Sequence, residues 1–352
     1  MKKILLFLIL FSCSTFKITR IDEKNSQELE VNCIENNVEN DSILIVSSYN
    51  VENLFDDIEN GYEYKDYSQK TSNYSREFFL KKIENIRKVL IDLNPDIIGL
   101  QEIETKRAIE ELFNHIKDLN YKCFVMADKP QFSIVKTALI SRYKIIQAIG
   151  YKTIPDVRNI LLAKILVNND TLVIFVNHWK SKRGPESERI KIAKIHRKIL
   201  DSLFSINPKM KVISLGDFNT HFDDNESDVI EGDAFNYKLV VGLKDYLINN
   251  NYLYDLWNEL EEDVRNKKIG SHYFRNKWGT LDHILVSQSL LDTNSTIYYI
   301  KSSFNVFRAN YLLTIDGIPY RWQIEFEGDF TIHLGKGFSD HLPIYAKFRI
   351  RN

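Results

Sequence analysis

Apolar runs rich in β-branched residues recur along the chain, and several follow one another with no helical pattern between them. Such runs predict buried strands. Because a doubly wound fold places a helix after each strand, consecutive strands argue against that fold. We therefore expect an α+β architecture, a four-layer α/β/β/α sandwich of two mixed β-sheets flanked by helices. The runs are ILIVSSYN, DIIGLQE, TALIS, LLAKILV, TLVIFVNH, KVISLGD, LDHILVS and LPIYAKFRI.

Helical patterns are fewer than strand patterns. Apolar residues from Phe79 to Leu93 are spaced by three or four residues, which predicts one face of an amphipathic helix that ends before Pro95. Similar spacing predicts a second helix over residues 192–203 and a third over 108–116. These helices are expected to cover the outer faces of the sheets.

The N-terminus has the features of an export signal. Lys2 and Lys3 precede an apolar run that is too short to span a bilayer and that ends at Ser12 and Cys13. LFSC resembles a lipobox, in which the cysteine is lipidated; cleavage to a soluble secreted protein is the alternative. We expect residues 1–12 to be a signal peptide and the exported protein to be anchored to the cell envelope through Cys13.

Residues 13–40 are rich in Asn, Glu, Lys and Ser, which predicts a flexible tether. Residues 41–352 carry globular patterning with no further linker, which predicts one domain. Cys33 and Cys123 could pair in an oxidising compartment. Because Cys33 lies in the predicted tether and Cys123 in a run typical of a core strand, we expect both thiols to be unpaired.

Polar residues stand where the apolar runs end or begin. Each run enters the core, so its polar terminus is expected at the rim of a sheet, where separate segments can form one site. Any one of these residues alone could be a cap, a turn residue or a solvated strand end. The set comprises Asn50, Glu102, His178, Asp217, Asn219, Asp282, His283, Asp340 and His341.

The composition of this set favours a hard cation. Carboxylate and amide oxygens suit Mg²⁺, with Mn²⁺ or Ca²⁺ as alternatives. Zinc is not expected, because the chain has three cysteines and no close Cys/His cluster. Histidines beside an oxygen-ligated metal indicate proton transfer and charge stabilisation at a phosphate.

The ordered series YNVENLF, GLQEIE, VNHWKSKRG, LGDFNT, WGTLDHILVS and GFSDHLPIY resembles the endonuclease/exonuclease/phosphatase superfamily, and within it the secreted bacterial nuclease-like branch. The resemblance spans residues 44–350, and GDFN followed late in the chain by SDH is specific to the superfamily. It implies a deoxyribonuclease I-like fold. It also implies a metal-dependent phosphodiesterase that hydrolyses extracellular DNA or RNA by in-line attack of an activated water.

The resemblance implies a role for each matching residue. Asn50, Glu102 and Asp340 would form the metal side of the site. Asp217 would position or deprotonate the attacking water, and Asn219 would hydrogen-bond the scissile phosphate.

The same resemblance implies the phosphate contacts. His341 would contact the phosphate, with Asp282 fixing its tautomer. Arg158 matches an arginine that grips phosphate with its planar fork. His178 matches a histidine of deoxyribonuclease I, but Lys136 stands in the strand that usually supplies its acidic partner, so a different orientation is expected.

Substrate preference is the part that the sequence constrains least. The net charge is −1, so no overall basic field indicates nucleic acid, although a local basic groove is compatible with it. HWKSKRGPESER places Lys180, Lys182, Arg183 and Arg189 near His178, which favours a polyanion, with Lys180 on the phosphate; a solvated loop is the alternative. Four tyrosines between residues 62 and 74 could stack on bases, but we expect most of them to cover the sheet edge.

Three functions therefore stay open. Nucleic acid is the expected substrate, with membrane contact through the lipid anchor, no protein partner and a monomeric state. A sphingomyelinase-like or phosphoinositide-directed enzyme is the alternative, and FNVFRANYLL is the nearest candidate for an apolar hairpin that enters a bilayer. A non-enzymatic surface binding protein is the third, which the filled catalytic positions oppose.

Overall fold

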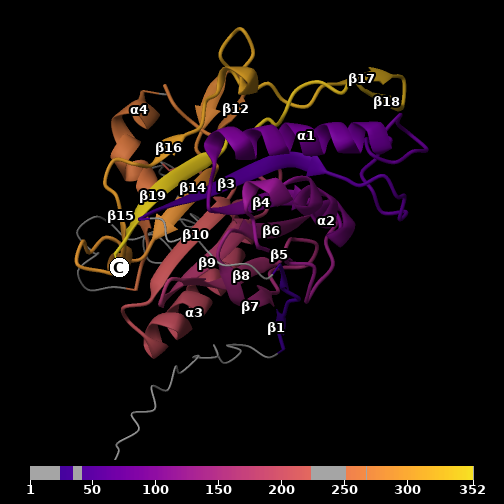
Figure 1. Cartoon of the computed structure of the whole chain (residues 1–352). Coiled ribbons are helices and arrows are strands. Elements are labelled where there is room, and N and C mark those ends of the chain that lie inside the picture. The colour runs from indigo at the N-terminus through magenta and orange to yellow at the C-terminus, as the bar shows by residue number, and fades with distance from the viewer. Residues whose placement is uncertain (1–23, 35–41, 223–250, 267, 352) are drawn as a thin grey trace, which may run out of the picture.

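A mixed β-sheet of eight strands, the first sheet, contains the longest strand of the protein. The computed structural model describes residues 24–34, 42–222, 251–266 and 268–351; the predicted signal peptide and Cys13 lie outside them (Figure 1). The strand order is β15-β19-β3-β4-β6-β5-β2, with β16 beside β19, and β3 and β4 are the parallel pair among the described strands of this sheet. The strands are β2 (Asn32–Cys33), β3 (Ile43–Leu54), β4 (Ile97–Ile103), β5 (Cys123–Met126), β6 (Lys136–Ser141), β15 (Ile297–Tyr299), β16 (Asn305–Val306) and β19 (Ile344–Ile350).

A second sheet of seven strands packs on the first. Its order is β1-β7-β8-β9-β10-β14-β11, and β9 and β10 form its parallel pair. The strand β7 was not among the predicted runs, because it begins with a lysine and because a glutamine interrupts its apolar residues. The strands are β1 (Ser26–Glu28), β7 (Lys144–Tyr151), β8 (Ile160–Val167), β9 (Asp170–His178), β10 (Lys211–Asp217), β11 (Tyr254–Asp255) and β14 (Asp282–Val286).

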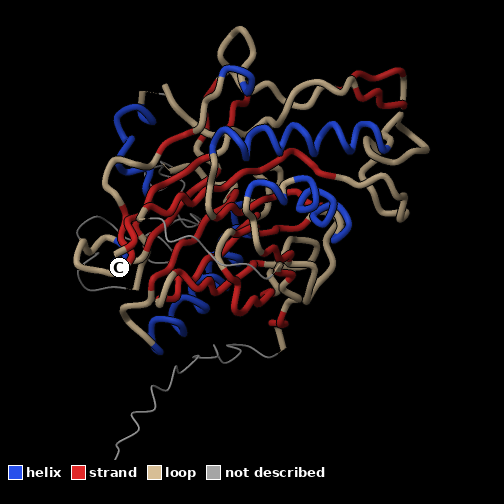
Figure 2. Tube along the Cα trace, in the orientation of Figure 1, coloured by secondary structure: helices blue, strands red, loops and turns tan. Residues whose placement is uncertain are grey.

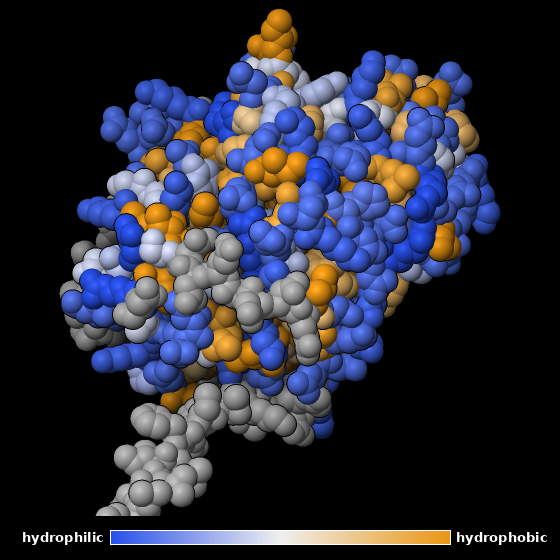
Figure 3. All heavy atoms as spheres, viewed as in Figure 1, coloured by the Kyte–Doolittle hydropathy of each residue, from blue (hydrophilic) through white to orange (hydrophobic). Residues whose placement is uncertain are grey.

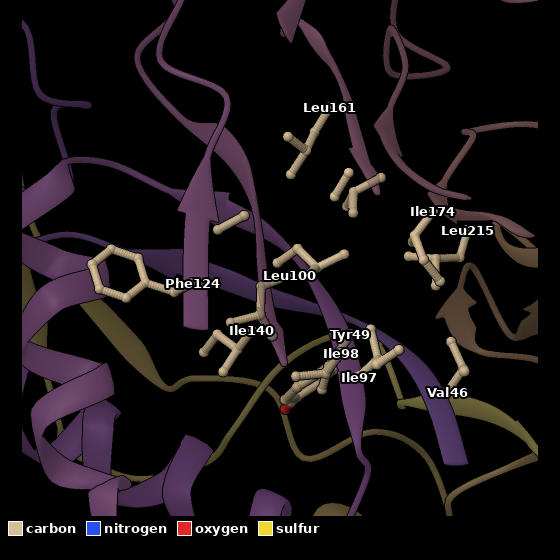
Figure 4. Close-up of a cluster of buried hydrophobic side chains, with 14 of the residues drawn as sticks. Val46, Tyr49, Ile97, Ile98, Leu100, Phe124, Ile140, Leu161, Ile174 and Leu215 are labelled. Atoms are coloured by element: carbon tan, nitrogen blue, oxygen red, sulfur yellow. The ribbon is translucent and has the colours of Figure 1, made fainter. Parts of the chain in front are cut away.

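The two sheets approach closely at Gly99 of β4. A Cβ atom built there would lie 2.3 Å from a Leu215 methyl group and 3.0 Å from a Val176 methyl group, both on the second sheet. Side chains of both sheets, including Leu100 and Ile174, form one cluster of buried hydrophobic residues (Figure 4). Close packing of this kind fixes the position of one sheet against the other.

Helices cover the outer faces of the sheets, as Figures 1 and 2 show. On the first sheet lie α1 (Arg76–Leu93) and α2 (Lys106–His115). The α1 helix ends at Asn94, whose left-handed backbone (φ 52°) stops it before Pro95. On the second sheet α3 (Glu186–Ile206) buries Ile192 and its neighbours. The predicted α/β/β/α sandwich is therefore confirmed.

Smaller elements complete the described chain. A long excursion between β16 and β19, residues 307–338 and called the arm from here on, lies along α1 and ends in a hairpin beyond the far end of that helix (Figure 1). Within the described residues no helix is long and apolar enough to cross a membrane. Hydrophilic residues cover most of the face seen in Figure 3, with apolar residues in scattered groups. The small elements are α4 (Glu261–Arg265) and the strand pairs β12 (His272–Phe274) with β13 (Lys277–Gly279) and β17 (Ile324–Glu327) with β18 (Phe330–His333).

Part of the predicted tether belongs to the fold. Its described residues form β1 on the edge of the second sheet and β2 on the edge of the first. Cys33 lies opposite Cys123 of β5, and the two form a disulfide. The prediction of unpaired thiols and of an unstructured segment here was wrong. Short edge strands carry almost no periodic signal, because their pairing is decided by the sheet they join.

Breaking the disulfide is expected to destabilise the protein. The bond joins residues that are 90 positions apart, so it removes much loop entropy from the unfolded chain, and its loss is expected to lower the free energy of unfolding by about 2–5 kcal/mol. Urea unfolding with and without reductant measures this. The Cys33→Ser/Cys123→Ser double variant should unfold at the same urea concentration as the reduced protein, and reductant should not change its midpoint. If reduction of the oxidised wild type left its urea midpoint unchanged, the disulfide assignment would be contradicted.

A buried histidine under α3 predicts a pH dependence of stability. His196 lies with its Nε2 atom 3.3 Å from the Ser214 hydroxyl, and burial followed by the charge of Arg197 lowers the pKa of its imidazole to about 3. The unfolded chain binds this proton below its ordinary pKa of about 6.5, so stability is lost as the pH falls from about 6.5 towards 3, by at most about 1.4 kcal/mol per pH unit. Urea unfolding between pH 7 and 4.5 should show a shallower decline for His196→Gln; an identical decline would refute this.

Candidate active site

The register of β10 brings residues of three strands together. Asp217 at the end of β10 lies opposite His178 of the parallel strand β9 and opposite Asp282 of the antiparallel strand β14. Gly216 precedes it with φ 134°, and a Cβ atom there would lie 2.1 Å from the Asn177 carbonyl oxygen. Only glycine fits this backbone, so the close approach of β10 to β9 just before Asp217 requires it.

The first sheet adds Asn50 and Glu102 at the same rim. The Asn50 Nδ2 group donates hydrogen bonds to Glu102 Oε1 and to Asp217 Oδ2, each over 3.1 Å, and so connects the two sheets. Glu102 has φ 69°, and β4 shifts register with its neighbours at this point. A bulge of this kind redirects a side chain at a strand end.

The Asp217 carboxyl is held at both oxygens, since Oδ2 accepts from Asn50. Its Oδ1 accepts a hydrogen bond from the Asn219 backbone N–H over 2.8 Å, and the Asn219 side chain donates to the Trp179 carbonyl oxygen over 3.2 Å. Burial raises the pKa of Asp217, and the carboxylates of Asp282 and Glu102 add to this against the opposing charge of His341. A carboxyl with a raised pKa accepts a proton more readily near neutral pH.

His341 pairs with Asp282 across the site. Its Nδ1 atom lies 2.6 Å from Asp282 Oδ2, which leaves Nε2 3.9 Å from Asp217 Oδ2 and 4.0 Å from Asp340 Oδ1. Burial lowers the pKa of the His341 imidazole, but the charge and hydrogen bond of Asp282 outweigh it and hold the pKa well above the ordinary value. The imidazole is therefore positively charged at neutral pH and its Nε2–H is available as a donor.

His178 differs from His341 in its surroundings. Its Nε2 atom lies 3.6 Å from Asp217 Oδ2 and 3.8 Å from Glu102 Oε1, while its buried Nδ1 has no hydrogen-bond partner among the described residues. Burial, with the charges of Arg158 and His341, lowers the pKa of His178 well below its ordinary value, so the ring is neutral. The Lys136 ammonium points elsewhere and donates to the carbonyl oxygens of Ile134 and Glu104.

The predicted phosphate contacts fall in two places. Arg158 lies beside Tyr64, and its charge acts on Glu102 and His178, so it borders the reaction centre. The Lys180 ammonium lies 3.6 Å from Glu188, and its phosphate role stays a prediction.

One basic residue of HWKSKRGPESER is structural rather than a contact for a polyanion. Arg189 is buried and donates to the carbonyl oxygens of Lys180, Ser181 and Gly184, so it holds the loop together. Its inclusion in the predicted basic cluster was wrong. Local bracing of this kind cannot be distinguished from a basic surface by sequence alone, because both use arginine.

Comparison with known proteins establishes the family. The model described as the Endonuclease/Exonuclease/phosphatase family matches residues 45–350. The chain belongs to the endonuclease/exonuclease/phosphatase family. Members of this family are phosphoester hydrolases and generally depend on a divalent cation, which supports phosphoesterase activity. No curated protein sequence matches.

Solved structures share the fold at low sequence identity. D. rerio TDP2 complexed with single strand DNA product is 16% identical, with a TM-score of 0.52 over 88% of this chain and 100% of that chain. The human Nocturnin catalytic domain with bound sulfate anion is 16% identical, with a TM-score of 0.51 over 92% and 98%. A mannosyl-6-phosphatase from Bacteroides thetaiotaomicron is 15% identical, with a TM-score of 0.50 over 87% and 99%.

The side chains of this family member fit a hard cation. Burial and the charge of Asp340 raise the pKa of Glu102, so two carboxylates that repel one another lie together. Ligand atoms of Asp217, Asp282 and His341 lie within 4.8 Å of one another, as do those of His272, Asp340 and His341. Each group combines carboxylate oxygens with imidazole nitrogens, and carboxylates suit Mg²⁺, Mn²⁺ or Ca²⁺. Glu102 lies outside both groups, and the assignment of Glu102 and Asp340 as the residues that would hold the cation stays a prediction.

Asn50 has a different geometry from the one expected of a ligand. Its Oδ1 accepts a hydrogen bond from the Glu52 backbone N–H over 3.1 Å, while its Nδ2 holds the carboxylates of Glu102 and Asp217. In this arrangement Asn50 orients two acids, and a metal bond would require its amide to turn.

Sequence reasoning missed three residues of the site. His272 of the β12–β13 hairpin lies with Nε2 4.0 Å from Asp340 Oδ2 and with its ring centre 4.6 Å from that of His341. Arg321 of the arm pairs with Glu52 and lies 4.0 Å from Asp340. Glu52, the third residue, lies within YNVENLF, but nothing in the sequence indicates that it pairs with Arg321. His283, which the sequence left without a role, is buried between Asp255 and the Thr220 carbonyl oxygen.

The His341–Asp282 pair is expected to act as a unit in catalysis. His341→Gln and Asp282→Asn should each lower kcat by about 10²–10³-fold on a phosphodiester such as bis(p-nitrophenyl) phosphate with Mg²⁺. The double variant should lose little more than the worse single variant, because each partner works through the other. Steady-state kinetics with urea unfolding as a folding control measures this. Multiplicative losses in the double variant would show that the two side chains act independently.

Proposed function

We propose that the protein is a metal-dependent phosphodiesterase that hydrolyses nucleic acid, DNA or RNA, outside the cytoplasm. The observation that carries the proposal is the meeting of a charged imidazole, His341, with a carboxyl of raised pKa, Asp217, beside the Glu102 and Asp340 carboxylates. These groups supply a proton donor, a proton acceptor and a cation site within one small region. That combination suits in-line attack of water on a phosphate ester.

The side chains divide the work by position. Asp217 has Oδ1 fixed by the Asn219 backbone and Oδ2 oriented by Asn50, and Oδ2, which faces His178 and His341, would orient water and take its proton. His341, fixed by Asp282, would donate its Nε2–H to a phosphate oxygen. One amide hydrogen of Asn219 is used by Trp179, which leaves the other for the same phosphate. A divalent cation held by Glu102 and Asp340 would neutralise the charge of the phosphate.

A nucleic acid substrate is supported by the surroundings of the site. TDP2 from D. rerio, which shares this fold, has been seen with a single strand DNA product. Arg158 beside Tyr64 offers a phosphate contact next to an aromatic ring, a combination that suits a nucleotide.

The segment that the sequence offered for entering a bilayer does not suit that role. The apolar residues of FNVFRANYLL do not form an exposed hairpin: Phe304, Val306 and Leu312 are buried. They pack in the main hydrophobic cluster, where they cannot enter a bilayer.

Export is part of the proposal. Disulfides persist in oxidising compartments, and the Cys33–Cys123 bond therefore supports a protein that leaves the cytoplasm. An anchor at Cys13 and a monomeric state complete the proposed picture. Mass spectrometry of the protein from its native membrane would show whether Cys13 carries lipid.

An assay across metals and substrates tests the function. Protein treated with EDTA should be inactive and should regain activity with Mg²⁺, Mn²⁺ or Ca²⁺ on plasmid, single-stranded DNA or RNA. Glu102→Gln should lower the rate by at least about 10²-fold at equal metal concentration. Release of phosphocholine from sphingomyelin, or of phosphate from phosphoinositides or phosphomonoesters, with no cleavage of nucleic acid would replace this proposal with one of those substrate classes.

A further inference from the structure

The arm brings a guanidinium to the reaction centre from a segment that none of the sequence motifs covers. The backbone of the arm is fixed on both sides of Arg321. The Phe338 N–H donates to the Tyr320 carbonyl oxygen over 2.7 Å, and the Trp322 N–H donates to Glu52 Oε2 over 3.0 Å. The backbone position of Arg321 is therefore fixed by the fold.

The guanidinium is held along one edge. Arg321 Nε donates to Glu52 Oε1 over 2.9 Å, and Nη2 contacts the same oxygen while lying 4.0 Å from Asp340 Oδ2. Among the described residues Nη1 makes no hydrogen bond, and the side chain is 58% exposed. An arginine that is fixed by a carboxylate and keeps a free donor edge is preorganised for an anion.

Lys82 holds the backbone of Glu52, the residue that pairs with Arg321. Its buried ammonium donates to the carbonyl oxygens of Glu52 and Phe338 over 2.8 and 2.9 Å. It therefore joins β3 to the end of the arm.

Two arginines thus border the reaction centre at different places. Arg158 acts on Glu102 and His178, whereas Arg321 lies against Asp340. The phosphate that is cleaved can be bound by one of these two arginines. A second guanidinium at the Asp340 end fits a second anionic group of the substrate.

We propose that Arg321 binds a phosphate next to the one that is cleaved, so that the substrate is a strand carrying successive phosphates. The inference rests on the proposed function and narrows it to a polynucleotide. A choline headgroup would place a cation where Arg321 stands, which like-charge repulsion disfavours.

Substrates with one and with several phosphates separate the possibilities. Arg321→Gln should lower kcat/KM on a single-stranded oligonucleotide by about 10–100-fold, the loss expected for a hydrogen bond to a charged group, chiefly through KM. On bis(p-nitrophenyl) phosphate, which has one phosphate, the loss of kcat/KM should be smaller than on the oligonucleotide. Arg321→Lys keeps the positive charge but not the planar guanidinium, so its kcat/KM on the oligonucleotide should lie between those of the wild type and Arg321→Gln.

Arg76→Gln is the matched control. Arg76 is a surface arginine of similar exposure, 52%, in ion pairs with Asp57 and Glu111. Its loss changes the net charge equally but should leave both substrates unaffected. Urea unfolding of each variant shows whether the arm still folds.

Binding without metal gives a second readout. In EDTA, fluorescence anisotropy of a labelled single-stranded oligonucleotide should show weaker binding by Arg321→Gln and a salt slope smaller by about 0.7, the value for one lost contact to a single strand. Equal losses on both substrates would overturn the inference, because Arg321 would then act through Asp340 on the reaction itself. Unchanged oligonucleotide kinetics and binding would also overturn it.

Failure of the proposed function would look different. A wild-type protein that hydrolyses neither substrate with any metal counts against the nuclease. The anisotropy comparison would still decide whether Arg321 is an anion contact.

Discussion

The register of β10 is the constraint on which the site depends. One residue, Asp217, faces a histidine on one neighbouring strand and an aspartate on the other only because the three strands are aligned to within a residue. A slip by one position would turn all of these side chains to the opposite face. Gly216 locks the alignment, and Asn50 then ties the aligned acids to the first sheet. Packing between the sheets, which is close at Gly99, thus helps to hold these side chains in place.

The site concentrates buried charge that the fold alone does not neutralise. Burial and mutual repulsion raise the pKa values of Asp217 and Glu102, while His341 takes a positive charge from its pairing with Asp282. Groups arranged in this way oppose folding and favour a cation and an anionic substrate. The same arrangement explains why the acids are braced by hydrogen bonds from backbone and amide groups, since each must keep its position against its neighbours.

The sequence predicted the centre of the site better than its borders. Asp282 and His341 are 59 residues apart, yet each flanks an apolar run, which placed both at a sheet rim, and the resemblance to the family implied their pairing. Their roles, like those of the other site residues, stay predictions. Arg321 and His272 lie in an arm and a short hairpin without periodic patterning, and no local signal places them. The Cys33–Cys123 pairing was missed because a two-residue edge strand is defined by its partner, not by its own residues.

The lengths of the strands at the sheet borders have a consequence for self-association. The second sheet ends in β1 and β11 and the first sheet in β15 and β2, and each of these four strands has only two or three residues. Long interior strands such as β3 never lie at a border. A foreign strand needs a run of unpaired backbone groups to add to a sheet, and these borders offer very short ones. The architecture therefore resists edge-to-edge aggregation, a useful property for a chain that must fold without the chaperones of the cytoplasm if it is exported.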